Sequence, residues 1–332
     1  MQHGKLLVVD DEPSNLALIE QILGEDYNLV FARNGQEALA AVAKHAPVML
    51  LLDVQMPDMD GYEVCRRLKA SPGGDQIPVL FITSRSDEID ENEAFEAGGV
   101  DFITKPISPL VLRARVRTHL SLVRATDLER SQRDAIDMLA RAGHFRDNDT
   151  GVHIWRMADY SALLAEAVGW SEESVALMKL AAPMHDTGKM GIPDAILQKP
   201  AKLDAAEWTV MKTHARIGHD ILARSEARVF KLAAEIALYH HERWDGSGYP
   251  EGLAGTEIPQ SARIVAVADV FDALSMRRPY KDPWPVERVV ETLNTEAGHH
   301  FEPELITLFN ASLERILEIK ATWDAREPDE LN

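Results

Sequence analysis

Short apolar runs alternate with amphipathic segments along the first part of the chain. The apolar runs are Leu6–Val9, Asn28–Ala32, Val48–Leu52, Val79–Thr83 and Val100–Ile103. Helical spacing of apolar positions separates them, at Asn15–Leu23, Gln36–His45, Gly61–Ala70 and Glu91–Ala97. Strands that alternate with helices are typical of a parallel sheet with helices on both faces. We therefore predict an α/β domain over residues 1–122.

The pattern changes beyond Pro106, where nearly every apolar position has helical spacing. Residues 108–143 are predicted to form one long connecting helix, because Ser108 can cap it, Pro109 suits its first turn and Gly143 can end it. Apolar heptads are not sustained along it, so coiled-coil dimerisation is only weakly indicated. We predict an all-α domain over residues 141–322.

Composition narrows the classes of function. The chain has 332 residues, enough for two domains at about 150 residues each. Its 35 Lys and Arg against 54 Asp and Glu give a net charge of −19, which opposes binding to nucleic acid. Apolar runs all fall short of the roughly 18 residues of a membrane span. Cys65 is the only cysteine, which favours a reducing compartment. We expect a cytoplasmic protein that binds neither nucleic acid nor membrane.

Polar residues stand where the predicted strands end. Asp10 and Asp11 follow the first strand, and Asp53 follows the third. With strand order 2-1-3-4-5 these two strands are neighbours, so the three carboxylates converge at the carboxyl edge of the sheet. Mg²⁺ prefers such an oxygen-only site. Thr83 ends the fourth strand and Lys105 follows the fifth, so a hydroxyl and a cation are predicted to point at the same pocket.

These motifs resemble a response-regulator receiver domain. The resemblance rests on Val9–Glu12, Leu52–Gly61, Ile82–Ser84 and Lys105-Pro106. It implies a flavodoxin-like, five-stranded parallel sheet of order 2-1-3-4-5. It also implies that a histidine kinase phosphorylates Asp53, with Mg²⁺ held by Asp10, Asp11 and Asp53. The residues expected to transmit this event are Thr83, Phe102 and Lys105.

Histidine and aspartate residues form an ordered set in the helical half. Its members are Asp149, His153, His185, Asp186, His214, His240, His241 and Asp269. Imidazole and carboxylate without thiolate suit Fe, Mn or Zn better than Mg or Ca. His185-Asp186 is predicted to close a helix over Ser174–Met184, and His240-His241 one over Val229–Tyr239. Adjacent helical residues point about 100° apart, so His240 and His241 favour more than one metal.

The ordered set resembles the HD superfamily of metal-dependent phosphohydrolases, and the loop His240–Pro250 resembles the HD-GYP family of cyclic di-GMP phosphodiesterases. The implied metal ligands are His153, His185, Asp186, His214, His240, His241 and Asp269. Asp186 would bridge two ions. Asp149 stands where three-metal members of the family usually carry the longer Glu. We expect two metals, Fe or Mn, and leave the third position at Asp149 open.

The same resemblance implies roles toward the substrate. Lys189 would steady the scissile phosphate or protonate the leaving oxygen, and so act with Asp186 in catalysis. Arg278 and Lys281 would grip the phosphates, Arg as a planar fork and Lys as a point charge. Tyr249 of the Gly248-Tyr249-Pro250 sequence is expected to contact the substrate.

The leading hypothesis is a response regulator, expected to be a homodimer, that hydrolyses cyclic di-GMP to pGpG and then GMP under control of Asp53 phosphorylation. Two alternatives stay open. One is a signalling adaptor of low turnover that binds a cyclic dinucleotide or a partner protein, such as one with a diguanylate cyclase domain. The other is a phosphodiesterase for a mixed cyclic GMP-AMP dinucleotide.

Overall fold

The computed structural model describes residues 4–84, 88–144, 152–276 and 283–326. The chain divides into two compact units, one up to Arg130 and one from Ser131. Within the described ranges, no helix is both long and apolar enough to span a bilayer.

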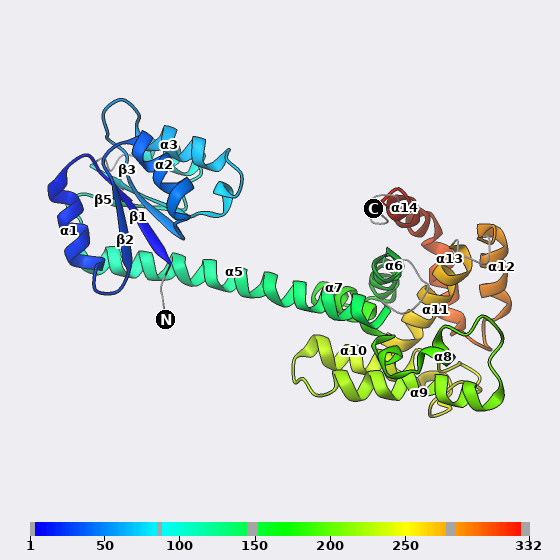
Figure 1. Cartoon of the computed structure of the whole chain (residues 1–332). Coiled ribbons are helices and arrows are strands. Elements are labelled where there is room, and N and C mark those ends of the chain that lie inside the picture. Colours follow the sequence, from blue (N-terminus) through cyan, green and yellow to red (C-terminus); the bar gives the residue numbers. More distant parts are fainter. Residues whose placement is uncertain (1–3, 85–87, 145–151, 277–282, 327–332) are drawn as a thin grey trace. The chain divides into compact units, whose positions relative to one another are not determined.

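The first unit is built on a parallel sheet of five strands in the order β2-β1-β3-β4-β5 (Figure 1). The strands are β1 Lys5–Val9, β2 Asn28–Ala32, β3 Met49–Asp53, β4 Val79–Thr83 and β5 Asp101–Thr104. This confirms the predicted fold class and strand order. The third strand starts at Met49 and includes Asp53, one residue later at each end than the sequence indicated.

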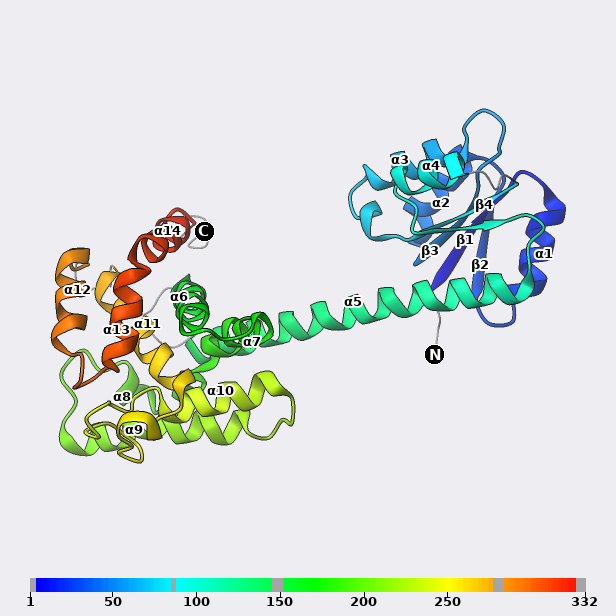
Figure 2. The same cartoon turned by 180° about the vertical axis from the view of Figure 1, so that it is seen from behind.

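Helices cover both faces of this sheet, as Figure 2 shows from behind. The helices are α1 Pro13–Leu23, α2 Gly35–His45, α3 Gly61–Lys69, α4 Glu88–Glu96 and α5 Pro109–His144, with a short 3₁₀ turn η1 at Gly74–Gln76. Side chains of α1 and α5, such as Ile19 and Leu112, pack on one face of the sheet. Those of α2, α3 and α4 pack on the other, where Ala38 and Val64 are buried. The strands are therefore apolar on both faces.

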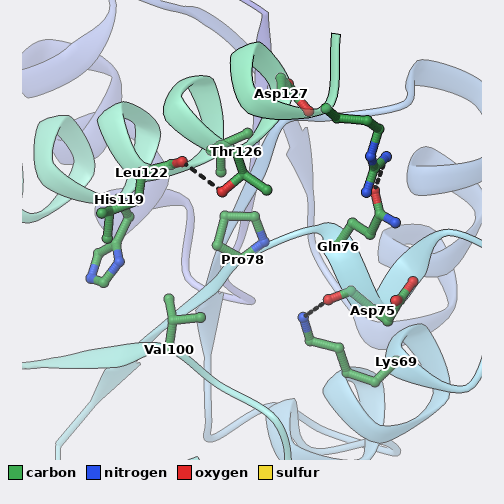
Figure 3. A pocket seen from close by; sticks show the side chains of 11 residues that line it. Lys69, Asp75, Gln76, Pro78, Val100, His119, Leu122, Thr126 and Asp127 are labelled. Carbon is green, nitrogen blue, oxygen red and sulfur yellow. Dashed lines mark hydrogen bonds between the residues drawn. The ribbon is translucent and has the colours of Figure 1, made fainter. Parts of the chain in front are cut away.

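A cavity of about 480 Å³ lies between α5 and the loops that precede β4 and β5. In Figure 3 it is bounded by Lys69, Asp75, Gln76, Pro78 and Val100 below, and by His119, Leu122 and Thr126 of α5 above. Arg130 closes one side by donating from Nη1 to Gln76 Oε1 at 3.0 Å. Since Pro78 and Val100 precede their strands, the cavity lies at the opposite edge of the sheet from Asp53.

The second unit is helical. Its helices are α6 Val152–Val168, α7 Glu172–Ala181, α8 Asp194–Leu197, α9 Ala205–Leu222, α10 Arg228–Tyr239, α11 Gln260–Ser275, α12 Val286–Thr295, α13 Pro303–Ala311 and α14 Leu313–Asp324, joined by the 3₁₀ turns η2 Ala182–Met184, η3 Thr187–Gly191 and η4 Gly255–Glu257. α6 and α11 pack against each other at the centre of one apolar core. Phe271 of α11 contacts Tyr160 and Phe309 edge-on, with ring centroids 5.3 and 5.1 Å away.

Several predicted helix ends differ from the structure by one to three residues, and those of α7 and α5 affect the site. α7 begins at Glu172 and ends at Ala181 instead of spanning Ser174–Met184, because Pro183 lacks an N–H and cannot continue an α-helix. The 3₁₀ turn that replaces the last turn carries His185 and Asp186 into a buried bend. The long helix α5 begins at Pro109 as predicted but runs one residue past Gly143, to His144.

Candidate functional site

Three aspartates meet at the carboxyl edge of the sheet in the first unit. Carboxylate oxygens of Asp10, Asp11 and Asp53 lie within 4.8 Å of one another. Lys105 Nζ lies 3.1 Å from Asp10 Oδ2 and 3.0 Å from Asp53 Oδ2. Asn15 Nδ2 donates to both oxygens of Asp10. The converging charges are thus only partly offset by groups of the chain.

Asp53, like Asp10, is almost fully buried at this edge. Burial raises the pKa of its carboxyl, the Lys105 ammonium opposes that rise, and the nearby Asp10 adds to it. Asp53 Oδ1 has no hydrogen-bond partner within the described ranges. A buried oxygen without a donor is costly unless a cation meets it, so the three carboxylates fit a hard divalent ion. Gly61 leaves room for this arrangement, because a Cβ there would lie 2.3 Å from the Asp53 carbonyl oxygen.

The predicted transmitting residues lie on β4, on β5 and just after β5, the two strands on one side of β3. Thr83 is buried at the end of β4, whose Ile82 is paired with Asp53 of β3. The Lys105 N–H donates to the Thr83 carbonyl at 2.7 Å. Phe102 of β5 contacts Phe95 of α4 edge-on at 6.4 Å. The structure thus places Lys105 at the carboxylates, Thr83 at the same end of the neighbouring strand β4, and Phe102 against α4.

The second unit brings distant histidines and aspartates into one cluster. Three overlapping groups have ligand atoms within 4.8 Å of one another: Asp186, His214, His240 and His241; His144, His185 and Asp186; and His153, His185 and Asp269. They come from α5, α6, α9 and α11, from the bend before η3, and from the end of α10. Because Asp186 and His185 each belong to two groups, the cluster is continuous.

Asp186 stands between two sets of imidazoles. Its Oδ1 lies 3.4 Å from His214 Nε2 and 3.7 Å from His240 Nε2. Its Oδ2 lies 3.3 Å from His185 Nε2 and 2.7 Å from Lys189 Nζ. Burial alone would raise the pKa of Asp186, but the charges of Lys189 and His185 hold it well below its usual value. The carboxylate is therefore ionised and offers one oxygen to each side.

The imidazoles are oriented by backbone carbonyls behind them. Nδ1 of His185 lies 2.9 Å from the Ala182 carbonyl oxygen, and Nδ1 of His214 lies 2.8 Å from that of Met211. Nδ1 of His240 is 3.1 Å from the carbonyl oxygens of the preceding helical turn. A carbonyl only accepts, so each Nδ1 carries a proton, and this hydrogen bond turns Nε2 toward the cluster. These three Nε2 atoms have no hydrogen-bond partner in the described part of the chain.

Such an arrangement fits divalent metal ions. Metal-ligating histidines commonly donate the second ring N–H to a carbonyl or carboxylate, and this fixes the ring with its other nitrogen toward the ion. His153 follows the same rule, since its Nδ1 lies 2.5 Å from Asp272 Oδ2 while its Nε2 is 3.6 Å from Asp269 Oδ1. Imidazole and carboxylate donors without thiolate suit a catalytic rather than a closed structural site.

Asp272 was not singled out from the sequence, although it lies one helical turn after Asp269 on α11. It is fully buried and also accepts from Arg156 Nε at 2.5 Å and Nη2 at 3.1 Å. Arg156 in turn donates from Nη1 to Asp324 of α14 at 2.8 Å. This network holds the His153 ring from the side away from the cluster.

The Gly248-Tyr249-Pro250 loop contacts the cluster through one aromatic stack. Tyr249 lies on the His241 ring with centroids 4.8 Å apart and an angle of 28° between the planes. Glu242 holds the loop, since its buried carboxylate accepts from the backbone N–H groups of Glu251, Gly252 and Leu253 at 2.7 to 3.1 Å. In the described structure Tyr249 therefore positions His241.

Comparison with known proteins agrees with this geometry. The family model of the response regulator receiver domain matches residues 6–117, and the model of the HD domain matches residues 124–305. The cyclic di-GMP phosphodiesterase response regulator RpfG of Xanthomonas campestris is 39% identical, over 97% of this chain and 92% of its own length. The chain belongs to the HD-domain response regulators.

Two proteins of Vibrio cholerae are also similar to this HD-domain response regulator. A probable cyclic di-GMP phosphodiesterase is 38% identical, over 95% of this chain and 79% of its own length. A 3'3'-cGAMP-specific phosphodiesterase is 46% identical, over only 59% of this chain and 38% of its own length. The relatives that match nearly the whole chain confirm the family expected from the motifs, and the HD domain implies a metal-dependent hydrolase.

Some predicted site residues of this HD-domain response regulator are not placed. Asp149, Arg278 and Lys281 lie outside the described residues. His144, in contrast, belongs to the cluster although the sequence did not single it out. The sequence indicated His144 only in that histidines become frequent from this position onward.

Proposed function

We propose that the protein hydrolyses cyclic di-GMP, first to pGpG and in a second turnover to GMP. The observation that carries the proposal is the ring of carbonyl-oriented imidazoles whose free Nε2 atoms surround the Asp186 carboxylate. Relatives that match nearly the whole chain are named for cyclic di-GMP phosphodiesterase activity, which supports the same substrate.

The metal ligands proposed are His153, His185, Asp186, His214, His240, His241 and Asp269, with Fe or Mn as the metals and a third ion left open at Asp149. Bound divalent ions supply a nucleophilic water at neutral pH and neutralise charge on the phosphodiester. Asp186 would be shared between two such ions. This sharing would keep the ions close together in the buried bend.

Lys189 is proposed to act directly on the substrate. Its Nζ is held 2.7 Å from Asp186 and is partly exposed, so it can reach a phosphate oxygen beside the cluster. There it would stabilise the developing charge or donate a proton to the leaving oxygen. Arg278 and Lys281 are proposed to hold the dinucleotide phosphates, and Tyr249 to contact the substrate from its stack on His241.

A turnover assay tests this function. Protein purified without oxygen and loaded with Mn²⁺ or Fe²⁺ is incubated with excess cyclic di-GMP, and the products are separated. We expect many turnovers per protein, lost in Asp186→Ala and retained in His219→Ala, a partly exposed residue on the same helix as His214. Stoichiometric binding without product would instead support the adaptor, whose partner we propose to be a diguanylate cyclase domain.

The mixed cyclic GMP-AMP dinucleotide is the second candidate substrate. One relative named for this specificity is 46% identical over 59% of the chain. Equal concentrations of the two dinucleotides in one reaction measure their ratio of kcat/KM directly. We expect cyclic di-GMP to be consumed first, and the reverse order would reassign the substrate.

The receiver unit is proposed to control this activity. A histidine kinase would phosphorylate Asp53, with Mg²⁺ held by Asp10, Asp11 and Asp53. Thr83, Phe102 and Lys105 would transmit the change to the connecting helix at residues 108–143 and to a homodimer. The test compares turnover and oligomeric state with and without a beryllofluoride phosphoryl mimic, with Asp53→Asn as control. Unchanged turnover and unchanged oligomeric state would contradict the coupling.

A further inference from the structure

His144 is a buried histidine without a partner for either ring nitrogen in the described residues. It is the last residue of α5 and is 5% exposed. Buried polar atoms are nearly always hydrogen-bonded, and each exception in a folded protein calls for an explanation such as an ion. The proposed roles of the cluster residues make no use of this imidazole.

The imidazole of His144 points into the metal cluster. A ring nitrogen of His144, a ring nitrogen of His185 and a carboxylate oxygen of Asp186 all lie within 4.8 Å of one another. The ring centroid of His144 lies 5.3 Å from that of His185 and 6.1 Å from that of His153. His144 is therefore grouped with His185 and Asp186, and its ring lies beside those of His185 and His153.

The backbone at the end of α5 is fitted to the same bend. A Cβ at Gly143 would lie 2.9 Å from Cα of Thr187, the residue after Asp186. Only a glycine lets the helix approach this closely, and Gly143 is helical, so close approach rather than a helix stop explains it. Gly143 thus lets the end of α5 pack closely against the bend, and His144 fills the space beside Asp186.

We propose that His144 is an additional metal ligand, contributed by the connecting helix to the ion that His185 and Asp186 hold. The assignment of the cluster as a metal centre rests on the proposed function, but the role of His144 goes beyond it. Because α5 is continuous from Pro109, the helix that starts in the receiver unit also supplies a ligand. A change in the receiver unit that shifts α5 would then directly alter the metal occupancy of the histidine and aspartate cluster.

Metal binding by the full-length protein tests the proposal without an activity assay. Chelator-treated wild type, His144→Ala, His144→Gln and the control His219→Ala are titrated with Mn²⁺ and with Co²⁺, whose visible spectrum reports nitrogen ligation. We expect His144→Ala and His144→Gln to bind one equivalent at least about tenfold more weakly and with an altered Co²⁺ spectrum. His219→Ala should match the wild type.

The outcomes separate this proposal from the proposed function. If the His144 variants bind every equivalent as tightly as wild type and give the same Co²⁺ spectrum, His144 is not a ligand even when cyclic di-GMP is hydrolysed. If their metal affinity falls while wild type hydrolyses no cyclic di-GMP, the ligand role stands and the function fails. Should His144→Ala not fold, His144→Gln decides, since it keeps most of the volume and only the ring nitrogen donors are lost.

Discussion

At the scale of single residues, the fully buried Asp272 accepts hydrogen bonds from two different side chains. It accepts from His153 Nδ1 and from the Arg156 guanidinium, both also buried. Burial alone would raise the pKa of Asp272, but these two partners lower it below its usual value. A group with a lowered pKa stabilises the fold above its unfolded pKa, so this contribution is present at neutral pH and is lost in acid.

We predict that Asp272→Ala destabilises the second unit by about 3–5 kcal/mol, because Arg156 would remain buried with its charge uncompensated on that side. The control Asp137→Ala removes an exposed pair with Arg141 and should cost no more than about 1 kcal/mol. Urea unfolding of the chelator-treated proteins measures both. A loss for Asp272→Ala no larger than that of the control would contradict this account of the network.

Cys65 provides a prediction about reactivity. It is fully buried on α3, and burial raises the pKa of its thiol to about 11. The thiolate is the reactive form, so it should be negligible up to pH 9 and form only as the pH approaches the raised value. We expect a disulfide reagent to label the folded protein at pH 8 far more slowly than the urea-unfolded protein. Equal labelling rates in the two states would show that the thiol is accessible.

At the scale of elements, α9 is placed against the metal-binding bend by two glycines. A Cβ at Gly188 would lie 1.9 Å from the carbonyl oxygen of His214, and Gly218 faces Gly188 from the next turn of α9. This close approach brings His214 within reach of Asp186. This close approach explains why the residue two positions after Asp186, Gly188, is a glycine.

We predict that Gly188→Ala pushes α9 away from the bend, costs about 1–3 kcal/mol and weakens metal binding. Gly169→Ala is the matched control: its φ of 96° strains an alanine, yet nothing lies within 4 Å of the added Cβ. The control should lose stability but keep the metal affinity of the wild type. Unfolding curves and Mn²⁺ titration of both variants test this, and unchanged affinity in Gly188→Ala would contradict it.

The elements differ in how well their bounds could be predicted from the sequence. Apolar runs were sufficient to predict the five strands, and capping residues to predict α5. Runs without alternation do not fix the ends of a strand, so the third and fifth strands were placed one residue early. Pro183 marked the end of α7, yet the helical spacing around it was stronger than this single signal. The cluster histidines were recognisable as an ordered set. His144 and Asp272 were not, because one buried histidine or aspartate has no periodic signal.

At the scale of the whole molecule, each unit has a core of its own. The receiver has an apolar cluster on either face of its sheet, and the helical unit has a single cluster around α6 and α11. Each unit also has its own cluster of residues that could bind metal ions. The first unit has three aspartates, and the second has histidines together with aspartates. The two units are therefore expected to respond to different ions.

We predict two thermal transitions in the chelator-treated protein, each shifted by one kind of metal. An ion that binds only the folded state at 100 times its Kd stabilises it by about 2.7 kcal/mol. Mg²⁺ should raise only the receiver transition, since three carboxylates and no imidazole favour a hard ion. Mn²⁺ should also raise the transition of the helical unit, through the buried imidazoles around Asp186.

Two variants assign the transitions in calorimetry. Asp10→Asn should abolish the response to Mg²⁺ without changing the response of the helical unit to Mn²⁺, and Asp186→Asn should do the reverse. A single joint transition would mean that the two units unfold together, coupled through α5, although each has a core of its own. Loss of both responses in either variant would show that the ions bind one shared site, which the distribution of ligand residues over two separate units argues against.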